Sequence, residues 1–562
     1  MIAFCELILN LKIMTQGISK RLCDFRGLCE RSLFLLPLFI VNEATAKDQG
    51  RPNILCITCE DISPRLGCYG DRVAKTPNLD AFAESAIRFS HMYTTVGVSA
   101  PSRSALITGM YPSAIGSNYM RNFTQPELMP EGIPPYQVVL PEGVKCYTEF
   151  MRAAGYYCTN NVKTDYQFDS PLTAWDELGR DAHWKHTPKG MPFFSIFNLE
   201  VTHESRVWSR ADQPLVVSPD EIEVPPYFPD DPVIRRDMAV MYSNIYEMDR
   251  QFQALVDELK AAGKWENTII IWYSDNGGPL PREKRAIYES GMLVPFMIRF
   301  PDGYRAGEVE ERMCMFPDIP ATILSLAGIC PPDYMQGKPF LGKYAEATPR
   351  EYVYGARNRM DEQVDKQGAV RDRRFRYVRN YNPERSNYNP NAYRLQMPMM
   401  RRMIELLQRD SLNEAQMRWF VAPRSEEEFY DVQNDPYELR NLIGDPRYAA
   451  DIDRLRKELD RWIDEDCPRW RQTELENQEM MWPGAQQPHL RKPVCVKTKA
   501  GVVVESEDKG VSFAYQINGK GYNEKHWFLY TGPVKLRKGD RLSVVAVRAG
   551  MKNSEIVEFI NK

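Results

Sequence analysis

Several residue types and patterns are scarce in this chain of 562 residues. It has six histidines, and its 72 Lys and Arg residues are outnumbered by 76 Asp and Glu residues. The resulting net charge of −4 argues against nucleic acid as the main partner, because nucleic-acid binding needs a strongly basic surface. The C-x-x-C pair Cys56 and Cys59 lies in the apolar run NILCITC. We therefore predict two buried strand residues there and no zinc or redox pair.

The sequence also lacks an apolar run long enough to cross a bilayer as a helix, which takes about 20 residues. Residues 32–41, SLFLLPLFIV, form a run of only ten. Arg26 and Arg31 precede this run and the small residues of Ala44-Thr45-Ala46 follow it, a pattern typical of a secretory signal peptide. We predict that residues 1–46 are cleaved after Ala46, that the protein is exported to the periplasm or beyond, and that the mature chain has no stable membrane span. The alternative is a buried or anchoring N-terminal helix.

The remaining sequence has an ordinary globular composition, with 43% hydrophobic and 26% charged residues. Apolar runs typical of buried strands alternate with stretches that have the 3–4 residue spacing of amphipathic helices. We predict strands at 53–58, 193–201, 268–273 and 295–300, and helices at 77–85 and 238–262. This alternation predicts an α/β fold, in which a large, mostly parallel mixed sheet is covered by helices on both faces.

The texture of the sequence changes twice towards the C-terminus. Beyond about residue 346 the chain is rich in Arg, Tyr and Met, with a short edge strand expected at 375–378 and a charged helix at 451–463. Residues 477–491 are polar and are predicted to be a linker. Short strands separated by Gly, Asn and Asp follow, as in a small β-sandwich. The predicted domains are an α/β domain at 50–345, a smaller α+β subdomain at 346–482 and a β-sandwich at 492–562.

Polar side chains follow three of the predicted strands. Glu60-Asp61 comes after the first strand, His203-Glu204 after the second and Asp275-Asn276 after the third. In open α/β sheets, ligands bind beyond the carboxyl ends of the strands. Each acidic pair taken alone is equally typical of a helix cap or a surface turn. Together, Glu60, Asp61, Asp275 and Asn276 offer oxygen ligands, which suit Ca²⁺ or Mg²⁺ better than zinc.

A second polar cluster lies in Ser99-Ala-Pro-Ser-Arg103. Pro101 fits the first position of a helix that continues to about Thr108, which places Ser99 just before the helix N-terminus. Free N–H groups at such a terminus favour an anion, and Arg103 adds a positive charge one turn later. The simpler interpretation of the pattern is a helix cap. With a metal site nearby, it predicts a hydroxyl group in a site for a tetrahedral oxyanion.

These motifs resemble those of type I sulfatases of the alkaline-phosphatase superfamily. The matching segments occur in family order and include NILCITCED, SAPSRSALITG, YSDNGG and KRAIYESGMLVP, and FYDVQNDPYELRNL extends the likeness to about residue 470. Among family members, heparan N-sulfatases (sulfamidases) and related exported bacterial sulfatases look most similar, through EVPPYFPDDPVIRRDMAVMYSNIYEMD.

The resemblance implies that Ser99 is oxidised to formylglycine after translation. In the family, a serine at this position requires a radical-SAM maturase as partner. One hydroxyl of the hydrated aldehyde, a gem-diol, attacks sulfur, and the other then expels sulfate. One Ca²⁺ ion would be held by the side chains that match the family's metal ligands, namely Glu60, Asp61, Asp275 and Asn276, together with residue 99. Asp275 is also a candidate to help deprotonate the diol.

The resemblance further assigns Arg103, Lys163 and Lys284 to binding the sulfate, and His203 to meeting the leaving group as general acid. For each of Lys163, Lys284 and His203 the structural alternative is an ordinary surface or strand-end residue. Two positions depart from the family pattern. Glu60 replaces the usual Asp, and Asp165 stands where a second histidine is usual. Asp165, Tyr166 or His203 alone remain as alternatives for the missing group.

The function implied is a sulfuric ester hydrolase that removes sulfate from a sulfated glycan, with a heparan-like O-sulfate or N-sulfate of a glucosamine-type sugar as the expected substrate. A phosphate or phosphonate ester hydrolase of the same superfamily is one alternative, and a non-catalytic protein that binds sulfated glycans is another. The Met-rich segment 396–403 is expected to pack as a helix. The C-terminal β-sandwich is expected either to bind glycan or to be a structural addition.

Overall fold

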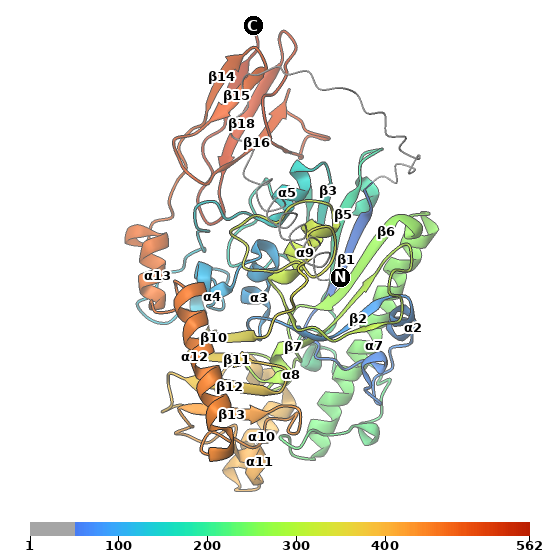
Figure 1. The fold of residues 1–562 in the computed structure, drawn as a ribbon, viewed down its shortest axis with the longest axis vertical. Helices are drawn as coiled ribbons and strands as arrows, with labels where there is room; N and C mark the ends of the chain where they lie inside the picture. The colour runs from blue at the N-terminus through green and yellow to red at the C-terminus, as the bar shows by residue number, and fades with distance from the viewer. Residues whose placement is uncertain (1–50) are drawn as a thin grey trace, which may run out of the picture. The chain divides into compact units, whose positions relative to one another are not determined.

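A nine-stranded sheet forms the centre of the computed structural model, which describes residues 51–562 (Figure 1). The predicted signal peptide lies outside the described residues. The strand order is β4-β3-β5-β1-β6-β7-β2-β8, with β9 beside β2. The strands are β1 (Asn53–Cys59), β2 (Ile87–Tyr93), β3 (Tyr157–Asn161), β4 (Glu177–Leu178), β5 (Phe193–Leu199), β6 (Thr268–Ser274), β7 (Leu293–Arg299), β8 (Val309–Glu310) and β9 (Cys314–Met315). Only β7 pairs antiparallel with its neighbours β6 and β2, so the predicted mostly parallel sheet is confirmed.

Helices cover both faces of this sheet, as strand β1 shows. Its seven residues are all buried, and successive side chains enter two different hydrophobic cores. Ile54 and Cys56 belong to the core that includes α3 (Ser99–Thr108), α5 (Tyr147–Ala153) and α9 (Asp318–Leu326). Leu55, Ile57 and Cys59 belong to the core that includes α2 (Pro77–Glu84) and α7 (Pro232–Ala261). Cys56 and Cys59 are therefore small buried strand residues, as predicted.

Two helices begin earlier than the sequence predicts. Helix α7 begins at Pro232, because the Asp231 carboxylate accepts a hydrogen bond from the Val233 N–H and caps the N-terminus. Helix α3 begins at Ser99 and not at Pro101, so Ser99 is its first helical residue and not the residue that precedes it. Gly109 ends α3 in the left-handed conformation that glycine tolerates best.

The second sheet is antiparallel, in the order β10 (Val353–Met360), β11 (Gln363–Arg371), β12 (Phe375–Asn380) and β13 (Glu427–Asp431). The prediction of a short edge strand at 375–378 is wrong in its placement, because β12 lies between β11 and β13. Helix α12 (Ala449–Asp466) packs on β11 and β12. Helix α10 (Pro398–Gln408) contains the Met-rich segment and buries Met399, Met400 and Met403 in the same core as α7.

Two antiparallel sheets lie near the C-terminus, β14 (Val494–Thr498) with β15 (Gly501–Glu505), and a sheet in the order β17-β16-β18-β19. The last four are β16 (Ser512–Ile517), β17 (Phe528–Leu529), β18 (Arg541–Val547) and β19 (Val557–Ile560). The polar segment 477–491 is not simply a linker. It begins inside α13 (Glu474–Met481), which Thr473 caps. Asn477 of this helix is buried, and its amide nitrogen donates to Thr473 O at 3.0 Å and to Tyr119 Oη at 3.4 Å.

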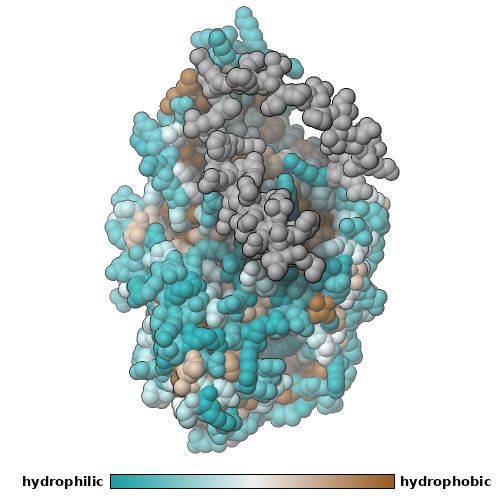
Figure 2. All heavy atoms as spheres, viewed as in Figure 1, coloured by the Kyte–Doolittle hydropathy of each residue, from teal (hydrophilic) through white to brown (hydrophobic). Residues whose placement is uncertain are grey.

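Short helices connect these layers, namely α4 (Pro112–Ile115), α6 (Arg206–Ser209), α8 (Glu289–Met292) and α11 (Glu414–Met417). Where grey atoms do not cover it, the face seen in Figure 2 is mostly hydrophilic, and hydrophobic residues form only small separate areas. Within residues 51–562, no helix combines the length and the apolar character needed to cross a membrane.

Leu459 offers a test of the packing between α12 and the second sheet. It is fully buried, and its methyl groups lie beside Gly368 of β11. We expect Leu459→Ala to lower the free energy of unfolding by about 2–5 kcal/mol, because a buried leucine leaves a cavity. Leu475→Ala, at a residue that is 48% exposed, should cost under about 0.5 kcal/mol. Urea denaturation of both variants checks this, and equal losses would contradict the packing described.

Asp237 of α7 should make stability depend on pH. Its carboxylate accepts the Met399 N–H at 2.6 Å, and burial raises its pKa to about 7. From about pH 4 to pH 7 the folded protein keeps a proton that the unfolded chain loses, so the free energy of unfolding falls as pH rises. Asp237→Asn should remove up to about 4 kcal/mol of this fall. Urea denaturation at pH 4.5 and 7.5 measures it. The control Asp212→Asn, at an exposed residue, should leave the fall in the free energy of unfolding unchanged. If Asp237→Asn showed the same fall as the unaltered protein, Asp237 would not be the group responsible.

Candidate active site

The two predicted acidic pairs meet at one edge of the large sheet, because β1 and β6 are parallel neighbours. Glu60 and Asp61 follow β1, Asp275 and Asn276 follow β6, and all four are at most 1% exposed. The Asp61 N–H donates to Asp275 Oδ1 at 3.2 Å, and Asn276 Nδ2 donates to Asp61 Oδ1 at 2.9 Å. The residues after these strands therefore bring three carboxyl groups and one amide together. Asp61 contacts both Asp275 and Asn276, and Glu60 is the residue before Asp61.

Helix α3 brings Ser99 and Arg103 to this edge. Ser99 Oγ donates to Asn276 Oδ1 at 3.2 Å, and the side chain is only 2% exposed. The Arg103 guanidinium donates to Asp275 Oδ2 at 2.9 Å, to Glu60 Oε1 at 3.1 Å and to Asn198 Oδ1 at 2.6 Å. Because Asn198 lies on β5, one guanidinium connects the ends of three adjacent strands to the helix that carries Ser99.

Lys163 follows β3, and its Nζ lies 2.5 Å from Glu60 Oε1. Burial opposes ionisation of Glu60, but Lys163 and then Arg103 outweigh it and hold the pKa of this carboxyl well below its usual range. Burial raises the pKa values of Asp61 and Asp275 even though Lys284 and Arg103 act in the opposite direction, and the neighbouring Glu60 charge adds to the rise. Asp61 and Asp275 therefore ionise less readily than a free aspartate, whereas Glu60 ionises more readily than a free glutamate.

Lys284 lies between two acids. Its Nζ is 2.6 Å from Asp61 Oδ2 and 3.4 Å from Glu204 Oε1. Glu204 in turn accepts two hydrogen bonds from Arg285, at 2.7 and 2.8 Å, and Arg285 Nε donates to Asp361 at 3.0 Å. Asp361 follows β10, so the second sheet supplies a buried partner to the loop that carries Lys284.

His203 faces the same acids from the end of β5. Its Nε2 lies 3.9 Å from Glu60 Oε2, and its Nδ1 contacts Ser205 Oγ at 2.8 Å. Burial, followed by the positive charge of Lys284, lowers the pKa of His203 to about 3. The imidazole is therefore neutral near pH 7. A role in protonating a leaving group needs an anion close to the ring, which would favour the imidazolium.

The structure separates two of the alternatives at the position of the missing histidine. Tyr166 is 5% exposed and packs in the hydrophobic core against Phe168, and burial raises the pKa of its hydroxyl above the usual range. Asp165 Oδ2 lies 3.8 Å from Lys163 Nζ, and its side chain is 25% exposed. Asp165 is therefore a neighbour of Lys163, and Tyr166 borders the same small buried space as Arg103.

Backbone conformations that are rare for residues other than glycine gather around the site. Asp61, Asp165, Arg285 and Asp361 have φ angles of 50°, 53°, 68° and 52°. Such left-handed conformations cost about 1–3 kcal/mol each when not glycine, and they persist where surrounding contacts fix them. For Asp61, Arg285 and Asp361, such contacts are the ion pairs Lys284–Asp61 and Arg285–Asp361.

The side chains at the strand ends fit a hard divalent cation by their chemistry. Asp61, Asp275 and Asn276 present carboxylate and amide oxygens next to Ser99, and all are buried where an unpaired negative charge is costly. Glu60 instead directs its carboxylate to Lys163 and Arg103. Within residues 51–562, no group of three His, Cys, Asp or Glu side chains is already gathered as a metal cluster. The fit therefore rests on donor chemistry.

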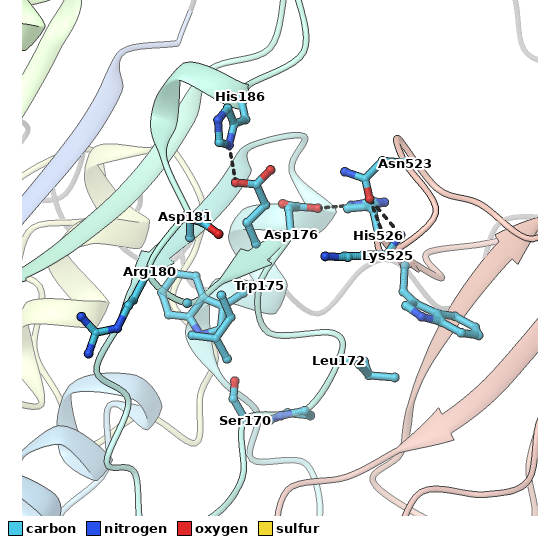
Figure 3. A pocket seen from close by; sticks show the side chains of 16 residues that line it. Ser170, Leu172, Trp175, Asp176, Arg180, Asp181, His186, Asn523, Lys525 and His526 are labelled. Atoms are coloured by element: carbon cyan, nitrogen blue, oxygen red, sulfur yellow. Dashed lines mark hydrogen bonds and ion pairs between the residues drawn. The ribbon is translucent and has the colours of Figure 1, made fainter.

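A cavity of about 610 Å³ among the described residues does not contain Ser99. It lies beside β4 and is lined by parts of 170–186 and 523–527 (Figure 3). A smaller space of about 20 Å³ lies behind Arg103 and Asn198. The most exposed side chains at the predicted site are those of Asp165, His203 and Lys163, at 25%, 20% and 18%. These three side chains are the predicted site residues that are most open to solvent.

The fold and these strand-end residues define a hydrolase of the alkaline-phosphatase-like fold, and comparison with known proteins specifies the family. A family model described as Sulfatase matches residues 52–329, and one described as N-sulphoglucosamine sulphohydrolase, C-terminal, matches residues 282–392. An ulvan-active sulfatase of Formosa agariphila is 40% identical to this chain, over 91% of both proteins. The chain therefore belongs to the sulfatase family and is a sulfuric ester hydrolase.

Two further relatives are more distant. N-sulphoglucosamine sulphohydrolase of Homo sapiens is 25% identical, over 74% of this chain and 90% of its own length. A solved structure described as a complex with its substrate D-glucosamine-2-N,6-O-disulfate aligns with a TM-score of 0.53 at 17% identity. The alignment covers 74% of this chain and 99% of that protein. At this identity the second likeness concerns the fold alone.

Sequence reasoning missed the residues that support the site from outside the motifs. The sequence places Glu204 in a strand-end pair but indicates no partner for it, and it indicates no role for Arg285. Asp361 and Asn198 carry no sequence signal, because their roles depend on contacts with residues 76 and 95 positions away. Tyr393 was also missed. Its ring lies 6.4 Å from that of His203 and 5.2 Å from that of Trp208.

Lys163 provides the first test of the site. We expect Lys163→Ala to lower kcat/KM on a small aryl sulfate by about 10²–10³, as for loss of one preorganised donor. The reason is that Glu60 loses its shortest cation contact and the site loses a charge that faces its open side. Lys189→Ala removes an exposed lysine without a contact and is the matched control. A loss below threefold at residue 163, with both variants folded by circular dichroism, would remove Lys163 from the catalytic site.

Proposed function

We propose that this sulfatase hydrolyses a sulfated polysaccharide through a formylglycine made from Ser99, with Ca²⁺ as its metal. The observation that carries the proposal is the position of Ser99. It is the first residue of α3, its Oγ is 3.2 Å from Asn276 Oδ1, and Arg103 of the same helix reaches Asp275 and Glu60. A helix N-terminus and the cations beside it favour the negative charge that develops on a sulfuryl group.

Ca²⁺ would be held by Asp61, Asp275, Asn276 and residue 99, with Glu60 as a further oxygen donor. When bound, it supplies positive charge that lowers the pKa of a coordinated hydroxyl and polarises a sulfate oxygen. The hydrated aldehyde of formylglycine supplies two hydroxyl groups, one to take the sulfuryl group from the substrate and one to release it as sulfate. Asp275, whose carboxylate lies beside both Asp61 and Arg103, is the candidate base for the second hydroxyl.

The remaining residues orient and neutralise the sulfate. Lys163 and His203 lie on the more exposed side of the acids, where the substrate arrives, whereas Lys284 is 2% exposed and holds Asp61. His203 is the candidate proton donor to the departing oxygen or nitrogen. Its resting neutrality makes this role depend on the bound sulfate, since an anion next to the ring raises the pKa of the imidazole.

The substrate proposal follows the relatives. The relative that is 40% identical over 91% of both proteins is described as active on ulvan, and its match extends over more of this chain than that of the human sulfohydrolase. We therefore propose a sulfated polysaccharide of the ulvan type as the first substrate to test. A heparan-like glycan with N- or O-sulfated glucosamine is the second candidate, supported by the C-terminal family match at 282–392.

Mass spectrometry of the tryptic peptide 89–103, FSHMYTTVGVSAPSR, tests the nucleophile directly. The protein is made in its native host or in a host with a serine-type radical-SAM maturase. We expect the loss of two hydrogens at residue 99 only, so Ser90 and Ser102 of the same peptide serve as internal controls. Ser99→Ala should abolish release of sulfate from ulvan and from N-sulfated glucosamine.

Three other outcomes would change the proposal. An unmodified Ser99 in a maturase-competent host would overturn the formylglycine mechanism. Binding of sulfated glycans without any release of sulfate would favour the non-catalytic alternative. Hydrolysis of a phosphonate monoester by protein with unmodified Ser99 would favour the phosphohydrolase alternative.

A further inference from the structure

The cavity of about 610 Å³ beside β4 is distinct from the predicted catalytic residues and lies between two parts of the chain (Figure 3). One wall comes from residues 170–186, around the edge strand β4 of the large sheet. The other comes from residues 523–527, in the loop before β17 of the C-terminal sheet. Strand β4 is at the edge of the large sheet. The cavity therefore lies between this edge and the loop that precedes β17 of the C-terminal sheet.

Buried contacts hold the two walls together. His526 Nε2 contacts Asp176 Oδ1 at 2.8 Å, and the side chains are 1% and 6% exposed. Arg152 bridges the same junction, with Nη2 2.8 Å from Asp176 Oδ1 and 2.7 Å from the Trp527 carbonyl oxygen. The His526 ring also stacks near Tyr157 of β3. The cavity is therefore formed before any ligand arrives, which reduces the entropy that binding costs.

These contacts neutralise some of the charges around the cavity and leave others free. Asp176 is paired with Arg152 and His526, and Glu177 accepts hydrogen bonds from Tyr157 and His186. Arg180 and Lys525 are exposed side chains with no ion pair, one from each wall. Two exposed acids, Asp181 and Glu524, are their sequence neighbours. Arg180 and Lys525 are thus the lining cations that an anionic ligand could pair with.

The cavity also offers apolar surface next to these charges. Leu172 and Leu178 are 40% and 48% exposed, and the Trp527 side chain is half-buried. An indole face packs against the C–H groups of a sugar ring, whereas sulfate or carboxylate groups of the same sugar would pair with Arg180 and Lys525. Apolar side chains and unpaired cations together are complementary to an acidic polysaccharide, because its sugar rings have apolar faces and carry anionic groups.

The wall at β4 leads directly to the catalytic edge of the sheet. The Val162 N–H donates to Gly179 O at 3.3 Å, and Asn161 Nδ2 donates to Arg180 O at 2.8 Å. Residue 163 follows at once. Strands β4, β3, β5 and β1 are parallel neighbours, so Arg180 lies at the same edge as Lys163, His203 and Glu60. Three strand spacings separate β4 from β1, about 15 Å in all.

We propose that this cavity is a second, non-catalytic binding site for the sulfated polysaccharide chain. Arg180 and Lys525 bind its anionic groups, and Trp527 packs on a sugar ring. The chain continues from there along the sheet edge to the catalytic residues. The proposal rests on the proposed function for the identity of the polymer. It makes the C-terminal strands part of substrate binding, since they supply Lys525 and Trp527.

Affinity electrophoresis in gels containing ulvan tests this binding without turnover, using protein that carries Ser99→Ala. We expect Arg180→Ala/Lys525→Ala and, separately, Trp527→Ala to raise the Kd for ulvan at least fivefold. Lys499→Ala/Lys538→Ala removes the same charge from two exposed lysines elsewhere and should leave Kd within twofold. Heparin in the gel replaces ulvan as the second sulfated probe, and unsulfated dextran should cause no retardation in any variant.

Kinetics of the same variants with Ser99 intact provide the second measurement. Turnover of a small aryl sulfate should stay within twofold, whereas kcat/KM on the polysaccharide should fall about as much as affinity falls. Unchanged binding of both sulfated probes, or equal weakening in the Lys499/Lys538 control, would overturn the proposal. If the cavity variants lose binding but the protein with Ser99 intact never releases sulfate, the result would support this binding site and count against the proposed function alone. The two failures are therefore distinguishable.

Discussion

The hydrogen bonds of Arg103 are the constraint on which the rest of the site depends. One buried guanidinium reaches Asp275 after β6, Glu60 after β1 and Asn198 on β5, and these three strands are adjacent in the sheet. Because Arg103 lies one turn after Ser99 in α3, the same contacts fix the helix start against the sheet edge. Removing one partner of such a buried pair leaves an uncompensated charge, which typically costs 3–5 kcal/mol. The position of Ser99 is therefore fixed by electrostatics as well as by packing.

The balance of charge around Ser99 explains why the site suits an anionic substrate in an acidic protein. Glu60, Asp61 and Asp275 face three cations, Arg103, Lys163 and Lys284, so the side chains are close to neutral as a group. A bound divalent cation would give the group a net positive charge. A sulfate ester entering from the side of Lys163 and His203 would then meet an attractive field, although the chain as a whole carries −4.

The fold could be predicted from sequence where the signal is local. Strands β1, β5 and β6 are continuous apolar runs, and α7 has a clear helical period, so their existence and type were predicted correctly. Predictions were wrong where distant contacts decide the structure. Strand β12 is central because β11 and β13 pair with it. Asn477 lies on the buried face of α13, where its amide nitrogen reaches Tyr119, 358 residues earlier in the chain. The predicted site residues come together at one edge, but Glu204, Arg285 and Asp361 could not be assigned from spacing, since each is defined by its partner.

The contact between Arg285 and Asp361 has a consequence for the order of synthesis. A ribosome that has completed residue 345 has made every side chain predicted to act on sulfate, from Glu60 to Lys284. It has not yet made Asp361, which the second sheet contributes to the Lys284 loop. Until then the buried Arg285 has only Glu204 to neutralise it. The nascent catalytic edge therefore stays electrostatically incomplete during translation, and it becomes complete only when the antiparallel strands fold back onto it.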